Sequence, residues 1–105
     1  MKIVNDRDTL RVSAVKELGA ANSTAFRKWV RDGLAAGCQH NIEIDLSETR
    51  LVDSCGLGAL LALQKTATAR GGRLRLCNPQ PPVQQVLDLT QLGQIFEIVN
   101  GRAVV

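Results

Sequence analysis

The chain has 105 residues, of which 45% are hydrophobic and 22% charged, and its formal net charge is +3. This length supports one core, so residues 1–105 are treated as one domain, and the composition excludes a disordered chain. Lys and Arg are scattered and only three aromatic residues occur, which excludes a base-stacking nucleic-acid platform. No uncharged stretch approaches the about 20 residues that cross a bilayer, and no signal peptide is recognisable, so a cytoplasmic protein without membrane insertion is expected.

The N-terminal residues predict a β-hairpin. Residues 9–15 alternate between apolar and polar side chains, which is typical of a half-buried strand. Residues 3–4 supply a partner strand across a polar turn at residues 5–8. The apolar positions of the longer strand are expected to face inward: Leu10, Val12 and Ala14.

A helix is predicted between residues 20 and 37. Its apolar residues recur at helical spacing and form one stripe that we expect to be buried: Phe26, Trp29, Val30, Gly33 and Leu34. Asn22 or Ser23 is expected to cap the start of this helix, and Gly37 to lie just past its end.

The rest of the chain continues to alternate between strands and helices. The pattern predicts, in order, a strand over residues 40–46, a short apolar segment at 51–53, a helix from Ser54 to about Arg70, a strand over 73–77, a helix with Pro82 in its first turn that runs to about Leu92, and a last strand over 95–99. Alternating strands and helices favour parallel neighbours joined by right-handed crossovers. The expected fold is therefore α/β, with a small mixed, mainly parallel sheet of four to five strands, an antiparallel edge at the N-terminus and helices packed against it.

The cysteine and histidine residues do not form a metal-binding pattern. Cys38, Cys55 and Cys77 lie far apart without a Cys-x-x-Cys pair, which is typical of free thiols in a reducing compartment. His40 opens a strand without a nearby ligand partner and is interpreted as structural. No metal and no cofactor are expected.

The sequence does not support an enzyme. It contains no phosphate-binding loop and no recognisable set of nucleophile, base and orienting group. The carboxylates of Glu43, Asp45 and Asp53 are expected to be solvated or to cap backbone groups, so no catalytic residue is predicted.

One segment combines a hydroxyl with glycines at the predicted start of a helix: Asp53, Ser54, Cys55, Gly56, Leu57, Gly58 and Ala59. The free N–H groups of a first helical turn and the positive end of the helix dipole favour an anion there. Gly56 and Gly58 are expected to keep this turn slim, so that another protein can approach the backbone. On the residues alone, an ordinary capping role for Ser54 is favoured over a switch.

The helix that follows is apolar on two faces. Leu57, Leu60 and Leu61 share one face, whereas Ala59, Ala62 and Leu63 share another. One face must pack on the sheet. The second face is either a docking surface or also buried, and periodicity does not separate these alternatives.

Several stretches of the chain resemble the STAS domain family. Residues 44–47 (IDLS) and 51–61 (LVDSCGLGALL) are similar to the pattern of the anti-sigma-factor antagonists in that family, and residues 71–76, 78–79 and 83–92 resemble its later strand and helix. The likeness covers about residues 40–98 well and residues 9–36 more loosely.

The resemblance implies a partner-switching function. In these antagonists the serine after the aspartate, here Ser54, is phosphorylated by an anti-sigma factor that is also a serine kinase, and a phosphatase resets it. The resemblance thus implies that residues 53–59 bind the partner and that a phosphate of about −1.5 to −2 charges releases it.

Two positions depart from the family pattern. Cys55 stands where Ser or Thr is usual, and we expect a small buried cysteine rather than a redox-sensitive thiol. Residues 16–19 read Lys-Glu-Leu-Gly, where the family has a Gly-Glu-Leu-Asp-like stretch beside the partner surface. This departure leaves a second role open, in which the domain is a regulatory or scaffold subunit of a lipid-transport ABC ATPase or of a stress-signalling complex. The sequence does not specify the partner or the oligomeric state.

Overall fold

The computed structural model describes residues 1–91 and 95–100. Its helices and strands, in chain order, are β1 (Lys2–Asp6), β2 (Thr9–Ser13), β3 (Glu17–Leu18), α1 (Ser23–Ala36), β4 (Asn41–Asp45), β5 (Leu51–Val52), α2 (Ser54–Ala69), β6 (Leu74–Cys77), α3 (Pro81–Leu89) and β7 (Glu97–Val99).

Five of the strands form one sheet in the order β1-β2-β4-β6-β7. β1 and β2 pair antiparallel, with Ile3 opposite Val12, and the remaining neighbours pair in parallel. The predicted α/β fold, with a mainly parallel sheet and an antiparallel N-terminal edge, is confirmed.

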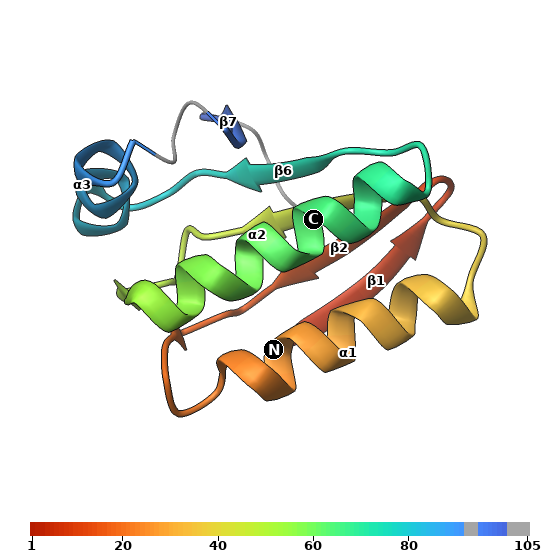
Figure 1. The fold of residues 1–105 in the computed structure, drawn as a ribbon, viewed down its shortest axis with the longest axis horizontal. Helices are drawn as coiled ribbons and strands as arrows, with labels where there is room; N and C mark the ends of the chain where they lie inside the picture. Colours follow the sequence, from red (N-terminus) through yellow and green to blue (C-terminus); the bar gives the residue numbers. More distant parts are fainter. Residues whose placement is uncertain (92–94, 101–105) are drawn as a thin grey trace.

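The helices α1 and α2 lie side by side over one face of this sheet, and both begin at the same end of the molecule (Figure 1). The core between them and the sheet contains fully buried side chains from each layer, among them Leu10, Val30, Ile44 and Leu60. Because α2 is covered by α1 on one side and by the sheet on the other, most of its apolar residues are buried.

The predicted stripe on α1 is confirmed except at one position. Phe26, Val30 and Leu34 are buried, but Trp29 is 59% exposed. A helix that packs over the edge of a sheet buries only a narrow stripe, and Trp29 lies about 100° around the helix from Val30. The prediction that Trp29 belongs to the core is therefore wrong.

The predicted helix ends are close to the observed ones. Gly37 follows α1 as expected, and Gly71 follows α2 with a φ of +80°, a backbone conformation that favours glycine. α3 has proline at its first two positions and ends at Leu89. The predicted run to about Leu92 is too long, because Thr90 is the C-cap and Gln91 has a φ of +60°; Leu92 itself lies outside the described residues.

A second, two-stranded sheet was not expected. β3 pairs in parallel with β5, so that Glu17 lies opposite Leu51 and Leu18 opposite Val52. β3 follows β2 and β5 precedes α2, so this pairing brings residues 16–19 beside the segment that begins at Asp53.

Candidate functional site

The start of α2 is held by Asp53, which occupies the N-cap position. Its carboxylate accepts hydrogen bonds from the backbone N–H of Gly56 at 3.0 Å and of Ala20 at 3.1 Å. Its own N–H donates to the Leu18 carbonyl at 3.2 Å. One residue therefore fixes the first turn of α2 to β3 and to the loop that leads into α1.

These bonds also set the charge of the cap. Hydrogen bonds from the N–H groups of Gly56 and then Ala20 hold the pKa of the Asp53 carboxyl below its usual range. The negative charge at the start of α2 is thus a permanent feature near neutral pH.

Ser54 is the first residue of α2 and is exposed. Within residues 1–91 and 95–100, its hydroxyl makes no side-chain hydrogen bond. The capping role that the residues alone favoured for Ser54 belongs instead to Asp53, so the exposed hydroxyl takes no part in holding the start of the helix.

The two glycines that follow differ in their surroundings. A Cβ atom on Gly56 would lie 2.2 Å from the Leu18 carbonyl oxygen, whereas one on Gly58 would meet no atom within 4 Å. Gly56 is needed for packing between α2 and β3, which corrects the expectation that it lets a partner approach. Gly58 is open to solvent and fits that expectation.

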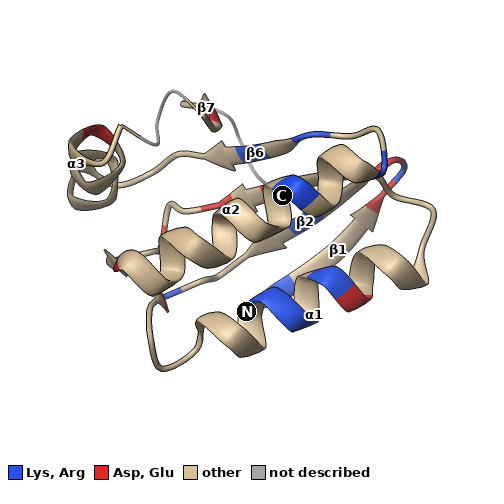
Figure 2. Ribbon diagram, viewed as in Figure 1, with Lys and Arg blue, Asp and Glu red and all other residues tan. Residues whose placement is uncertain are grey.

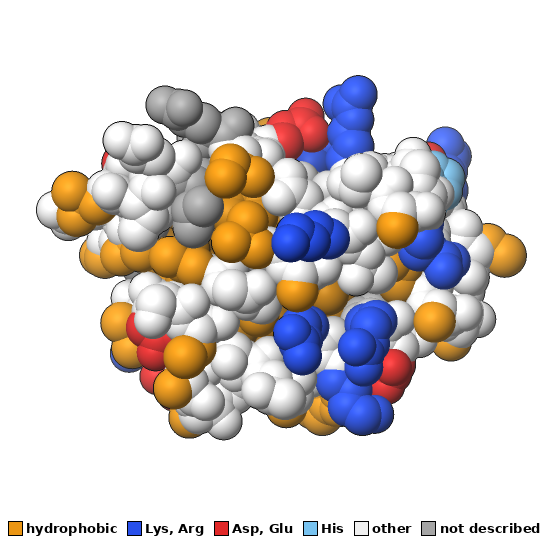
Figure 3. All heavy atoms as spheres, in the orientation of Figure 1, with side chains coloured by type: hydrophobic (Ala, Val, Ile, Leu, Met, Phe, Trp, Pro, Cys, Tyr) orange, Lys and Arg blue, Asp and Glu red, His pale blue; other side chains and the backbone are white. Residues whose placement is uncertain are grey.

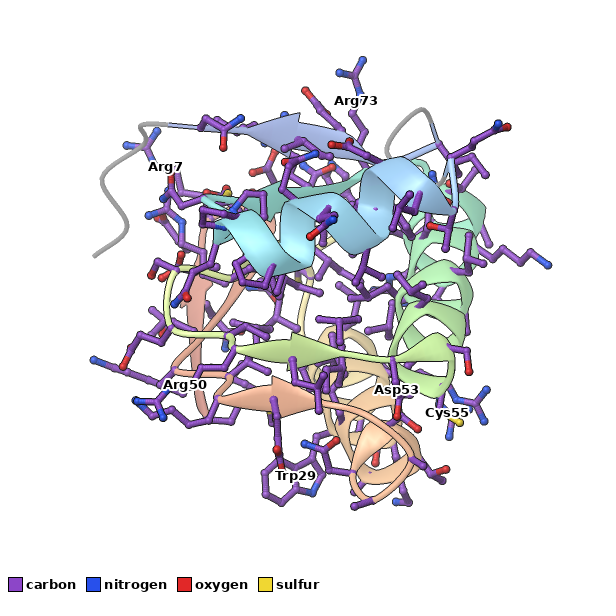
Figure 4. All side chains as sticks on the ribbon, turned by 90° about the vertical axis from the view of Figure 1, so that its left-hand side faces the viewer. Arg7, Trp29, Arg50, Asp53, Cys55 and Arg73 are labelled. Carbon is purple, nitrogen blue, oxygen red and sulfur yellow. The ribbon has the colours of Figure 1, made fainter. Side chains whose placement is uncertain are left out.

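The remaining residues of the segment divide in the same way. Leu57 and Ala59 are buried within the domain, and Cys55 is exposed. The surface that a partner can reach therefore consists of Ser54, Cys55 and Gly58, with the edge of Asp53 beside them. Figure 4 shows Asp53 and Cys55 together at the beginning of α2, with Cys55 pointing away from the domain.

The exposure of Cys55 contradicts the expected small buried cysteine. Its side chain lies on a shallow groove of about 310 Å³ between the first turns of α2 and α1, which Gly58, Thr24 and Arg27 also line. The first turn of α1 was missed as part of this surface, because the sequence gives no signal that the two helices begin side by side.

The segment of residues 16–19 reaches the start of α2 at Gly19, whereas Lys16 lies at its other end beside Arg50. Lys16 donates a hydrogen bond to the Glu48 carboxylate, which lowers the pKa of Glu48, and both side chains are exposed. A Cβ atom on Gly19 would lie 2.7 Å from a carboxylate oxygen of Asp53. Glycine at this position therefore leaves the N-cap of α2 undisturbed, where a larger side chain would push against it.

The other candidate polar residues have structural surroundings. Asp45 accepts bonds from the backbone N–H and the hydroxyl of Ser47, as expected for a capping carboxylate. Glu43 is only 2% exposed and accepts a bond from Cys77 Sγ at 3.3 Å, so the expectation that it is solvated is wrong. Among residues 1–91 and 95–100, no three acidic, His or Cys side chains gather as a metal site, and no helix is long and apolar enough to span a bilayer.

A family model for the STAS domain matches residues 1–103. The chain belongs to the STAS domain family. The predicted family is thereby confirmed, and the N-terminal residues that fitted it loosely are included in the match.

Several relatives of this STAS domain are named for a regulatory role. A Thermotoga maritima protein assigned by its name to the anti-sigma factor antagonists is 35% identical over 99 residues, which cover 94% of this chain and 86% of that protein. The crystal structure of an anti-sigma factor antagonist from Thermotoga maritima superposes with a TM-score of 0.85, at 32% identity over 93% of this chain and 84% of that one. The anti-sigma F factor antagonist of Paenibacillus polymyxa is 36% identical over 64 residues, or 61% of this chain and 54% of that protein.

A third relative has been solved in two chemical states. The anti-sigma factor antagonist SpoIIAA in its unphosphorylated form superposes with a TM-score of 0.84, at 22% identity over 96% of this chain and 87% of that one. The phosphorylated form from Bacillus superposes with a TM-score of 0.75 over 96% and 90% of the two chains. At this identity the likeness shows a shared fold.

Proposed function

We propose that this STAS domain is a non-catalytic anti-sigma-factor antagonist that binds an anti-sigma factor with serine-kinase activity, and that phosphorylation of Ser54 releases the partner. A phosphatase would restore the binding state. The observation that carries this proposal is the position of Ser54, which is exposed as the first residue of α2 beside a fixed carboxylate.

The surface around Ser54 suits a contact that a charge can disrupt. The first two turns of α2 carry no charged side chain (Figure 2), and Gly58 lets a partner approach the backbone. A phosphate on Ser54 would add about −1.5 to −2 charges to these turns, next to the Asp53 carboxylate and across the groove from Arg27. If the partner offers no cation, the free energy of desolvating that charge at the interface exceeds the binding free energy of a moderate complex.

Asp53 strengthens the effect of a phosphate. Its carboxylate is held ionised by two backbone N–H groups, so the phosphate would be added directly beside an existing negative charge. The free N–H groups at the start of α2 offset part of this repulsion within the chain, which allows the modified protein to remain folded. A partner that brings further negative charge to this surface would be repelled.

The neighbouring segment sets which partner fits. Lys16 is paired with Glu48, and Gly19 contributes no side chain next to Asp53. The acidic group that the family pattern has at position 19 is thus absent from the surface beside Ser54. We propose that the partner of this chain contacts the uncharged start of α2 and the Lys16–Glu48 pair instead of such an acidic group.

The test is co-purification of the full chain from cells that contain its natural partners. Wild type and Ser54→Ala should capture an anti-sigma kinase, identified by mass spectrometry, whereas Ser54→Asp should capture at least about tenfold less. Thr68→Asp makes the same kind of substitution at an exposed position near the other end of α2 and should bind as wild type. Equal capture by Ser54→Ala and Ser54→Asp would contradict the switch.

The rival role predicts a different result in the same experiment. A constitutive subunit of a lipid-transport ATPase or of a stress-signalling complex would be captured by all four proteins alike. The unusual residues at positions 16–19 are the feature that favours this role, and the identity of the captured protein decides between the two.

A further inference from the structure

The outer edge of β1 is open. β1 is the first strand of the sheet and pairs only with β2 among the strands of the described residues. Ile3 and Val4 are each 37% exposed although both are large and apolar. The strand contains no proline, and over residues 2–6 it pairs with β2 residue for residue, without a bulge. The free N–H and C=O groups along the outer edge of a strand pair readily with another strand that matches it.

The side chains of β1 are sorted onto two faces. Ile3 and Asn5 lie opposite Val12 and Leu10, which are buried under the helices, so they belong to the helix-covered face. Lys2, Val4 and Asp6 therefore share the other face. On that face the strand presents a cation at one end, an apolar residue in the middle and an anion at the other end.

This pattern is complementary to itself. If β1 pairs antiparallel with β1 of a second copy across a two-fold axis through Val4, Lys2 lies opposite Asp6 of that copy and Val4 lies opposite Val4. Asp6 in turn lies opposite Lys2 of that copy, so both charge pairs are attractive. Opposite charges directly across an antiparallel pair stabilise it, and like charges destabilise it. A two-fold axis perpendicular to the sheet keeps the helix-covered faces of both copies on the same side.

Trp29 supplies a second observation at the same edge. Trp29 and Met1 line one hollow of about 310 Å³, with Phe26 also on its wall, so Trp29 lies on the side of α1 that faces the start of β1. In Figure 1, α1 lies in front of and below β1, and in Figure 4 Trp29 points away from the body of the domain. A strand added to β1 would extend the sheet beneath α1 on this side and would cover part of the exposed indole.

We propose that this edge is a self-association surface, in which β1 of one chain pairs antiparallel with β1 of a second copy across a two-fold axis through Val4. A contact of five residues on each side, with one indole, is well below the about 1,000 Å² of a stable interface. The dimer is therefore weak and reversible, with a dissociation constant on the order of 100 µM. This proposal does not depend on the function proposed for Ser54.

The first test is a dilution series of the wild-type chain. Sedimentation velocity from about 5 µM to 1 mM should show a monomer–dimer equilibrium. Because the chain has one Trp and no Tyr, the intrinsic fluorescence reports on Trp29 alone, and its emission should shift to shorter wavelength as the dimer forms. A purely monomeric chain at 1 mM with constant emission would overturn the proposal.

The second test uses the charge pattern. Lys2→Asp places two Asp–Asp pairs in the interface and Asp6→Lys places two Lys–Lys pairs, so each variant alone should associate at least about tenfold more weakly than wild type. Mixed in equal amounts, the two variants restore both attractive pairs and should form a heterodimer. Lys65→Asp, on the exposed surface of α2, is the matched control and should associate as wild type.

The outcomes of the charge test separate this edge from other contacts. Asp6 also pairs with Arg11 at 3.1 Å in the same chain, so each variant is first checked by its thermal unfolding. Dimers of unchanged affinity in both single variants would show that another surface associates and would overturn the proposal. Failure of the folded variants to associate when mixed would do the same.

Discussion

Two glycines separated by one residue in α2 show how the same residue type serves two different surfaces. Gly56 faces the Leu18 carbonyl with no room for a methyl group, whereas Gly58 faces open solvent. The inner side of the first turns is fixed by Asp53 and by β3, and the outer side carries the exposed Ser54 and Cys55. A rigidly held helix start can therefore present a hydroxyl that takes no part in holding it.

The largest change in stability is expected from adding a side chain at Gly56, on the side of α2 that packs against β3. Gly56→Ala would force α2 away from the backbone of β3, and overpacking of this kind costs about 2–3 kcal/mol. We expect a fall in Tm of roughly 10 °C, measured by circular dichroism. An unchanged Tm would show that the inner side is not tightly packed.

The sequence predicted the helices and strands around these glycines but not which of the two glycines is enclosed. The alternating strands and the helical spacing located the elements of the sheet and both long helices, because burial imposes these periods on the chain. The family pattern located the segment that begins at Asp53. Which glycine is enclosed and which is open depends on the β3–β5 pairing, a contact of two residues on each side that leaves no periodic signal.

The exposed residues were the least predictable. Trp29 was assigned to the core because its spacing matches the buried stripe, and Cys55 because a small cysteine is usually buried. Trp29 is exposed because only a narrow stripe of α1 packs on the sheet. Cys55 is exposed because the first turn of α2 directs it away from the domain. Figure 3 shows, in addition, that Lys and Arg side chains gather over the middle of the face formed by α1 and α2, although they are scattered in the sequence.

A second prediction concerns the cap that holds the helix start. Asp53→Ala removes the acceptor for the N–H groups of Gly56 and Ala20 and should lower Tm by roughly 5 °C at pH 7. Asp53→Asn keeps an acceptor for one of these N–H groups, so its Tm should lie between the Tm of wild type and that of Asp53→Ala.

The effect of Asp53 should depend on pH in one direction. Because its pKa in the folded protein is lowered, its ionised form stabilises the fold above the ordinary pKa of an aspartate, and this contribution is lost as the pH falls through the lowered value. The difference in Tm between wild type and Asp53→Ala should therefore be constant from pH 5 to 7 and shrink below about pH 4. A difference that grows on acidification would contradict the assignment.

The outer glycine should respond in the opposite sense to the inner one. Gly58→Ala adds a methyl group in open space and replaces glycine within a helix, which should stabilise the chain by about 0.5–1 kcal/mol, measured by urea unfolding. The same variant should reduce capture of the partner if that partner approaches the backbone at Gly58. Destabilisation by Gly58→Ala would show that the outer side is also packed.

The smallest effect is expected at Cys55. Cys55→Ser restores the residue type that the family pattern has here, and because the side chain is exposed, the free energy of unfolding should change by less than about 0.5 kcal/mol. In the native protein, Cys55 and Cys38 should react with a thiol reagent before the buried Cys77 does. Protection of Cys55 would place its side chain inside the domain.

The central claim is tested most directly by the chain that carries phosphoserine at position 54, prepared by genetic incorporation. Its affinity for the protein captured by the unmodified chain is measured by isothermal titration calorimetry, with the unmodified chain as reference. We predict binding at least about tenfold weaker for the phosphorylated chain, with its fold retained. Equal affinities of the two folded chains would contradict the claim that the charge at Ser54 decides docking.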